Sequence, residues 1–491
     1  MTGLLQSENE MFRRLRIHRR VTAAFGGSSG TTRALVSLAG PIAAAMAGET
    51  LMGLVDTKLV GGLGPAALGG VGVAMTIAFF GYMMIFGLMR GVKVCVAHAV
   101  GQGLEHRSVR YAQAGVALGL TAGAAVWACT RDVTPLLRAI RVAPPLVPYA
   151  GAFLAVYTVG APASAVASAL THHRQALGDS RTPMIVGLAA NVLNALLGWS
   201  LIYGHAGLPA LGVRGGAMAT VTAEMAEAAV LLTLLVRRTR RSGYYERARS
   251  ELSLGRAVRE VAHLGVPTGL QFGSEMLAFA TFTALLGTLG TEQIAAHQIA
   301  LATIRTSFLP GTAVSEAASV LVGQALGRRS LADADRTTRA ALLLAVSFMA
   351  TCGVFFALGG GVLARAFTDD PLVVTTARRL LLIAAGFQVL DAVSIVLRGA
   401  LRGARDVRVP ALIGVAVVWT CIPTAALLLG RVAGWGAAGG WCGFVAETTI
   451  GAALFAARWR SGSWRGAYAS RERDQRAFDV GAEFALRGGE S

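Results

Sequence analysis

Residues 41–68 read PIAAAMAGETLMGLVDTKLVGGLGPAAL, and residues 267–294 read PTGLQFGSEMLAFATFTALLGTLGTEQI. The second segment repeats the first at a constant offset of 226 residues, which aligns Pro41 with Pro267 and Glu49 with Glu275. Further repeats follow in the same order: AVGQGL (99–104) resembles LVGQAL (321–326), and QALGDSRTP (175–183) resembles GALRGARDVRVP (399–410). These repeats predict two structurally related halves.

The composition is that of a membrane protein. The chain is 54% hydrophobic and only 15% charged, whereas soluble domains carry roughly 25% charged residues. Its 61 glycines suit helix packing in lipid, where small residues let backbones approach closely. The net charge of +18 does not indicate a nucleic-acid partner, because the basic residues lie in short segments between apolar stretches, and that pattern sets orientation in a membrane.

Twelve apolar stretches are long enough to cross a bilayer, which takes about 20 residues in a helix. Lipid satisfies no backbone polar groups, so we expect helices, and the stretches are too long and too uniformly apolar for barrel strands. The sequence therefore predicts an all-α integral membrane fold of twelve transmembrane helices in two pseudo-symmetric six-helix lobes. The stretches cover 34–60, 67–97, 109–130, 146–170, 184–204, 212–236, 258–287, 293–326, 338–362, 372–397, 409–430 and 434–457.

The distribution of Lys and Arg predicts the orientation. With a cytoplasmic N-terminus, and with basic residues near the ends of the stretches counted with the adjoining loops, the tails and even-numbered loops hold 33 basic residues and the opposite loops hold 8. Because basic residues concentrate in cytoplasmic segments, we expect both termini in the cytoplasm. The expected divisions are a tail (1–33), an N-lobe (34–236), a basic linker loop (237–257), a C-lobe (258–457) and a second tail (458–491).

Several motifs resemble those of the multidrug and toxic compound extrusion (MATE) family. The resemblance covers about residues 34–457, and the motifs keep the family's order in both halves. They are Val55-Asp56-Thr57 before Gly61-Gly62-Leu63-Gly64, Asn191-Val192-Leu193-Asn194, LGTLGTEQIAAHQIA (286–300) before Phe308-Leu309-Pro310-Gly311 and VGQALG (322–327), and Phe387-Gln388-Val389-Leu390-Asp391 before Leu401-Arg402-Gly403 and Asp406.

The resemblance implies a V-shaped pair of lobes that alternates between outward and inward access. It implies a secondary active antiporter in a bacterial inner membrane, exporting organic, cationic or amphipathic compounds in exchange for Na⁺ or H⁺. Internal repeats of this kind are typical of secondary transporters. We expect a monomer surrounded by lipid, with no cofactor beyond the coupling ion. The alternative is a flippase or exporter of an anionic or lipid-linked compound.

Acidic side chains inside spans are functional candidates, because charge in the membrane is costly. Glu275 and Asp391 match the family's C-lobe cation site, and two adjacent carboxylates can share a proton or hold a hard cation such as Na⁺. Asp56 matches the family's N-lobe acidic position; its structural alternatives are a bond to a neighbouring helix or a pair with Lys58. The expected lining of the substrate cavity is Glu49, Asn191, Asn194, Gln271 and Arg305.

Two features depart from the family pattern. Gly198 stands where many proton-coupled relatives carry Asp, which moves the expected coupling site towards Glu275 and Asp391. Arg90, Lys93 and Arg305 stand where the family has small or polar residues. Cations at a cavity repel a cationic substrate and would favour the anionic alternative, unless they pair with Glu316, Glu49 or Glu275.

Motifs typical of other protein classes are absent from this chain. There is no GxxxxGK[ST] phosphate loop and no HExxH motif, and the GxSxG match at 26–30 has no strand before it. The five cysteines lie in apolar stretches without a CxxC pair, so a disulfide or metal role is not expected. A membrane acyltransferase has only His172 and His173 in its favour, which we expect in a solvated loop. We therefore expect no catalytic residues.

Overall fold

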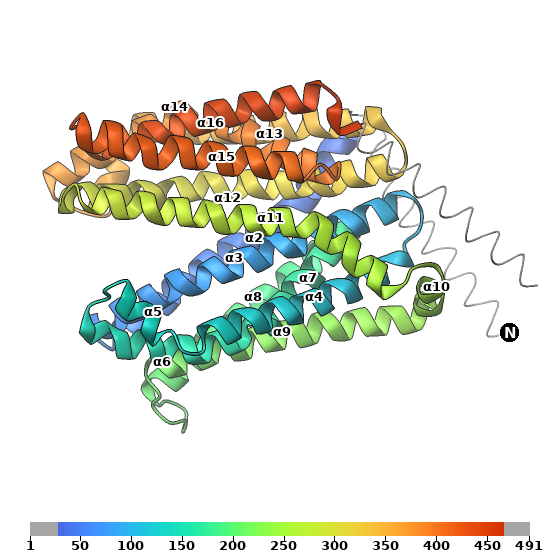
Figure 1. The fold of residues 1–491 in the computed structure, drawn as a ribbon, viewed down its shortest axis with the longest axis horizontal. Helices are drawn as coiled ribbons and strands as arrows, with labels where there is room; N and C mark the ends of the chain where they lie inside the picture. The colour runs from blue at the N-terminus through green and yellow to red at the C-terminus, as the bar shows by residue number, and fades with distance from the viewer. Residues whose placement is uncertain (1–27, 466–491) are drawn as a thin grey trace, which may run out of the picture.

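The computed structural model describes residues 28–465, and within this range the chain forms helices and no β-strand (Figure 1). The helices are α2 (Ser28–Gly61), α3 (Pro65–Gly101), α4 (Arg107–Thr130), α5 (Thr134–Ala139), α6 (Val147–Tyr157), α7 (Ala161–Ala176), α8 (Arg181–Tyr203), α9 (Val213–Ser242), α10 (Tyr244–Glu251), α11 (Leu254–Gly287), α12 (Thr291–Gly327), α13 (Leu331–Arg365), α14 (Pro371–Gly403), α15 (Arg408–Ala425) and α16 (Gly436–Arg460). Most of the two expected tails, 1–27 and 466–491, lies outside the described residues.

Ten segments of the described chain are long and apolar enough to cross a membrane. They include α6 and α7, which join into one segment from Pro144 to Ala176. Helices α11 and α12 are as long as the others, with 34 and 37 residues, but are not among the ten. Both carry polar side chains into the packed interior, Gln271 and Glu275 on α11 and Glu316 on α12. The expected all-α membrane fold is therefore confirmed, while strong apolar character holds for ten of the twelve expected spans.

The helices form two bundles. Figure 1 shows α11–α16 lying together on one side and α4–α9 on the other, with α2 and α3 reaching the first group. Helix α3 packs along α11 and α12, and α2 packs against α12 and α13. The bundles lie close together at the end of the molecule that holds α10, called here the α10 end, and further apart at the end that holds α5 (Figure 1). The exact lobe boundaries remain a prediction.

Glycines set how closely the bundles approach at the α10 end. Gly87 and Gly91 of α3 face Gly265 and Gly269 of α11. A β-carbon at Gly265 would overlap the carbonyl oxygen of Leu88. The two backbones are therefore in direct contact, as small residues allow in membrane helices.

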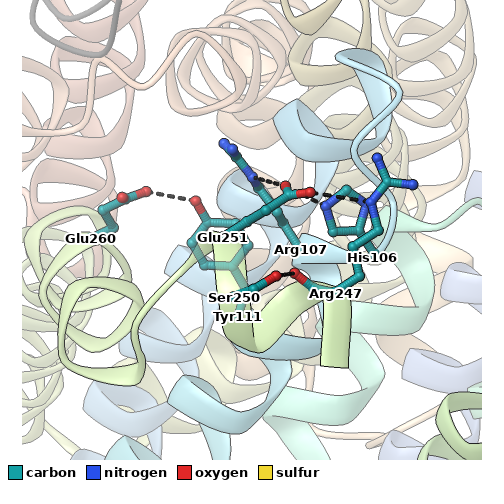
Figure 2. A network of polar contacts seen from close by, with 7 residues as sticks. All are labelled: His106, Arg107, Tyr111, Arg247, Ser250, Glu251 and Glu260. Carbon is teal, nitrogen blue, oxygen red and sulfur yellow. Dashed lines mark hydrogen bonds and ion pairs between the residues drawn. The ribbon is translucent and has the colours of Figure 1, made fainter. Parts of the chain in front are cut away.

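The segment expected to link the two lobes (237–257) is largely helical. Helix α9 continues to Ser242, and α10 covers Tyr244–Glu251. An Arg247–Glu251 ion pair of 3.1 Å, four residues apart, supports α10. Figure 2 shows that Glu251 also accepts hydrogen bonds from His106 and Arg107, which hold α10 against the start of α4.

We expect Gly265→Ala to lower the midpoint of thermal unfolding of the purified protein, because the added methyl forces α3 and α11 apart. Gly359→Ala is the matched control: Gly359 also lies inside a helix, but its β-carbon would meet nothing within 4 Å. Alanine is favoured over glycine in a helix by about 0.5–1 kcal/mol, so the control is expected to be neutral or stabilising. Equal effects of the two substitutions would contradict the close crossing.

The Glu251 contact predicts a pH-dependent attachment of α10. Burial opposes ionisation of Glu251, but hydrogen bonds from His106, Arg247 and Arg107 outweigh it and hold the pKa of this carboxyl below its ordinary value. A lowered folded-state pKa contributes stability that is present at neutral pH and lost as the pH falls through that pKa. We expect Glu251→Gln to speed amide hydrogen exchange in residues 244–251 at neutral pH, with the difference from wild type shrinking in acid. Glu246→Gln, an exposed position on the same helix, should leave exchange unchanged at both pH values.

Candidate functional site

Glu275, Glu447 and Arg398 come together inside the α11–α16 bundle, and Asp391 lies nearby. Arg398 of α14 donates to Glu275 of α11 over 3.0 Å, and its second terminal nitrogen lies 3.9 Å from Glu447 of α16. Asp391 of α14 is close enough to Arg398 and Glu447 to interact with both electrostatically. We call Glu275, Asp391 and Glu447 the acid group. The two predicted C-lobe acids thus lie in one site, which also holds Glu447 and Arg398.

Neighbouring residues fix the Glu275 carboxylate. Gln271, one turn earlier on α11, donates to it over 2.8 Å. Gly414 of α15 covers the pair so closely that a β-carbon there would lie 2.7 Å from the Gln271 amide and 3.0 Å from the carboxylate. Gln271 is therefore a buried partner of Glu275 rather than the open cavity lining that the sequence analysis expected.

The Asp391 carboxylate, unlike that of Glu275, is not fixed by neighbouring side chains. Among residues 28–465 no hydrogen bond or ion pair to its carboxylate is present, and its side chain is partly exposed. Helix α14 starts at an N-cap in which Asp370 accepts hydrogen bonds from the amides of Leu372 and Val373, and it runs without an internal proline to Gly403. Asp391 and Arg398 are therefore about two turns apart on one rigid helix.

A second acid lies in the other bundle. Asn194 of α8 donates to both carboxylate oxygens of Asp56 at 3.2 Å, and its own amide oxygen accepts from Thr220 of α9 over 3.3 Å. Of the structural alternatives for Asp56, the bond to a neighbouring helix is present; the pair with Lys58 is not, since the described chain has no ion pair there and Lys58 is exposed. Glu49 is exposed on α2 and interacts electrostatically with Glu227 of α9.

A buried ion cluster joins the two bundles. Glu316 of α12 lies 2.6 Å from Arg90 and 2.6 Å from Lys93, both on α3, and 3.5 Å from Arg402 of α14. All four side chains are at most 7% exposed. The Arg90 guanidinium also lies over the rings of Phe86 and Phe272, 4.9 and 4.3 Å from their centroids, a cation–π arrangement. We call Glu316, Arg90, Lys93 and Arg402 the Glu316 cluster.

Helix α14 connects the acid group with the Glu316 cluster, because it supplies an arginine to each of them. Arg402 and Arg398 are one turn apart on α14, and Arg402 pairs with Glu316 whereas Arg398 pairs with Glu275. The cluster has three cations around one carboxylate, and the acid group has three carboxylates around one cation. The eight groups balance in formal charge, but the charge is separated: excess positive where the bundles meet, and excess negative inside the α11–α16 bundle.

Several predicted residues lie elsewhere. Arg305, predicted to line the substrate cavity, is exposed and makes no hydrogen bond or ion pair with the described residues, so the alternative of a pair with Glu316, Glu49 or Glu275 is absent. His172 and His173, expected in a solvated loop, are buried in α7; His172 contacts the Phe86 ring edge-on and the Ser168 carbonyl. The two histidines are buried because the fourth span continues to Ala176, about two turns beyond its predicted end.

Two residues of the site, Arg398 and Arg402, were not predicted from the sequence. Arg398 and Arg402 were counted with the loop after the tenth span, whereas α14 continues to Gly403 and buries them. A signal was available, because positions 391, 398 and 402 recur at helical spacing and so share a face.

The comparisons with known proteins agree with this fold. The MatE family model matches residues 41–200 and 267–427. A multidrug resistance protein NorM of Burkholderia vietnamiensis is 32% identical over 429 residues, covering 86% of this chain and 92% of the relative. A probable NorM of Pseudomonas syringae is 31% identical over 420 residues, covering 83% and 90%.

Solved structures share the fold. A MOP superfamily transporter from Pyrococcus furiosus, described as having a binding pocket of reverse polarity, matches with a TM-score of 0.80 at 20% identity, covering 91% of this chain and 98% of that one. An outward-facing multidrug resistance MATE transporter matches with a TM-score of 0.80 at 21% identity, covering 90% and 98%.

The membrane-spanning helices and the buried charges between two bundles define a polytopic membrane transporter. The family match extends over both halves, and the chain belongs to the MatE family of efflux transporters, as the sequence motifs predicted. Such a protein moves its substrate across the membrane and is not an enzyme in the catalytic sense.

We expect Glu316→Gln to destabilise the protein by about 3–5 kcal/mol, the cost of leaving buried charges without their partner. Thermal unfolding of the purified protein in detergent measures this loss. Glu292→Gln, an exposed position on the same helix, should change little. Adding Lys93→Met to Glu316→Gln removes one unpaired cation and should restore part of the stability; no recovery would show that the cations do not depend on Glu316.

Proposed function

We propose that this chain is a secondary antiporter that exports organic, cationic or amphipathic compounds in exchange for Na⁺ or H⁺. The observation that carries the proposal is the excess of carboxylates in the acid group, where Arg398 is the basic residue in contact with Glu275 and Glu447 among the described residues and Asp391 lies nearby. Such a site gains stability from a proton or a hard cation. The names of the relatives, multidrug resistance proteins, support export of drug-like compounds.

The coupling ion enters at Asp391, whose carboxylate has no hydrogen bond or ion pair within the described chain. A cation there competes with Arg398 for the negative charge of Glu275 and Glu447. Asp56, which accepts hydrogen bonds from Asn194, is a second titratable site in the other bundle. Transport requires that ion and substrate prefer different states, because a ligand with equal affinity for both states shifts nothing.

The Glu316 cluster acts as the closed gate in this scheme. Arg90 and Lys93 come from α3, and Glu316 and Arg402 come from the α11–α16 bundle, so parting the bundles at the α10 end must break these ion pairs. Charge changes in the acid group reach the cluster because Arg90 and Arg402 also interact electrostatically with Glu275 and Arg398. Ion binding would thereby alter the free energy of closure.

The substrate would lie between the bundles, in contact with Glu49, Asn191 and Arg305. Glu49 is exposed and has a second acid, Glu227, nearby, which favours an organic cation. The anionic or lipid-linked alternative now rests on Arg305, since Arg90 and Lys93 are buried against Glu316. We place the α10 end in the cytoplasm of a bacterium and propose that one chain suffices for transport.

The test is efflux of a fluorescent organic cation from proteoliposomes under imposed sodium or pH gradients. We expect gradient-driven efflux in the wild type and at least a tenfold loss with Asp391→Asn, about the effect of losing one buried charged interaction. The gradient that drives efflux identifies the ion. Asp369→Asn, an exposed acid outside the acid group, is the control.

If efflux survives in Asp391→Asn but is lost in Asp56→Asn, the coupling ion binds at Asp56 in the other bundle and not at Asp391. If the wild type moves no organic cation under either gradient, the proposed substrate class is wrong, and anionic substrates are then compared for wild type and Arg305→Gln.

A further inference from the structure

His172 of α7 lies beside the Glu316 cluster, although the proposed exchange does not use it. Its side chain is buried, with 2% of its surface exposed. The His172 ring meets the Phe86 ring edge-on, with 5.1 Å between the centroids, and the Arg90 guanidinium lies 4.9 Å from the centroid of the same Phe86 ring. The histidine is therefore covered at the place where the two bundles meet.

The hydrogen bonds of the His172 ring determine where a second proton would bind. Nδ1 lies 2.9 Å from the backbone carbonyl oxygen of Ser168, and because a carbonyl oxygen only accepts, Nδ1 carries the hydrogen. Nε2 of the neutral ring is then an acceptor, and it is buried without a hydrogen-bond partner within residues 28–465. A proton on Nε2 would give the ring a positive charge and an N–H group that has no acceptor in this arrangement.

The surroundings of His172 are already rich in positive charge. The charged groups that act on its ring are Lys93 and Arg90 of α3 and Glu316 of α12. The Glu316 cluster holds three cations around one carboxylate, and like charges near a group disfavour its charged form. The closed contact between the bundles is therefore compatible with neutral His172 and opposes a protonated one.

Three further helices, α4, α8 and α9, pack on α7. Glu224 of α9 interacts with Ser164, about two turns before His172, and Arg238 of α9 acts on His173 instead. The other ionisable groups near this end of α7 either have partners elsewhere or are exposed: Arg107 bonds to Glu251, Tyr111 to Glu260 and Arg110 to Gln113, Arg238 also pairs with Glu105, and Arg181 is exposed.

We propose that Nε2 of His172 is a proton-binding site that stays empty while the bundles are closed at the α10 end and takes up a proton when they part. Gln324 of α12 donates over 2.9 Å to the carbonyl oxygen of Ala176, one turn beyond His172. Parting the bundles removes α12 from α7 at this point and admits water to the ring. Because the open state then binds one proton more than the closed state, closure is favoured as the pH rises and opening is favoured as it falls.

This inference rests on the gate proposed above for the Glu316 cluster, but it does not depend on the substrate or on the coupling ion. Histidine is the side chain whose charge ordinarily changes between pH 5 and 8. The site would therefore let acidification at the α10 end hold the gate open, whichever ion drives transport.

The experiment measures the distance between two spin labels across the α10 end by double electron–electron resonance. The labels are attached at Arg237→Cys of α9 and Ala332→Cys of α13, both exposed positions, in the full-length protein with its native cysteines replaced by alanine. We expect a short distance at pH 7.5 and a second population at longer distance at pH 5.5. One proton taken up on opening raises the ratio of open to closed molecules by up to about tenfold per pH unit, and we expect at least a tenfold rise over this range.

His172→Gln retains an amide that can donate to the Ser168 carbonyl but cannot be charged, and it should keep the short distance at both pH values. His172→Asn is the second variant if His172→Gln does not fold. The matched control is His173→Gln, because His173 is also 2% exposed with an Nε2 that lacks a partner within the described residues, but lies near Arg238 and Arg174. The control should open in acid as the wild type does. A shift of wild-type size in the His172 variant, or no shift in the wild type, overturns the proposal.

Discussion

Burying charge away from water is the constraint on which the rest of this structure depends. Glu316 meets it by pairing with three cations, two from one bundle and one from its own. A buried ion pair adds little to stability compared with apolar packing, but removing one partner is costly. The cluster therefore contributes more to selecting which surfaces of the two bundles face each other than to the stability of their contact. It also explains why α12 lacks the uniform apolar character of a lipid-facing span.

Helix α14 links this contact to the acid group. Arg402 and Arg398 leave the same helix one turn apart and satisfy carboxylates at opposite ends of the charge distribution. Because α14 is continuous and capped at its start, a displacement of Arg398 is transmitted to Arg402 by the backbone itself. The structure thereby places a group of carboxylates and a bundle-to-bundle contact on one continuous helix, and the proposed antiport would need such a link between ion binding and a change of access.

Much of this architecture could be read from the sequence, and the failures share a cause. Apolar length and the 226-residue repeat predicted the helical membrane fold, and the cost of buried charge singled out Asp56, Glu275, Asp391 and the pairing of Lys93 with Glu316. Hydropathy could not show that α7 and α14 continue past their apolar parts, because their last turns are polar yet buried by neighbouring helices. Arg398, Arg402, His172 and His173 were misplaced for that reason. The Arg90 and Arg402 contacts depend on which bundle faces meet, which no local pattern encodes.

The glycine crossing of α3 and α11 has a mechanical consequence. Interlocked side chains must be withdrawn before two helices can change their angle, whereas Gly87 and Gly91 meet Gly265 and Gly269 backbone to backbone. Helices in contact in this way can stay close together while the angle between them changes. The crossing lies nearer the α10 end than the α5 end of both helices, so a rotation there moves the helix ends beside α5 further than those beside α10. The bundles can therefore open widely on one side while the chain at the crossing hardly moves.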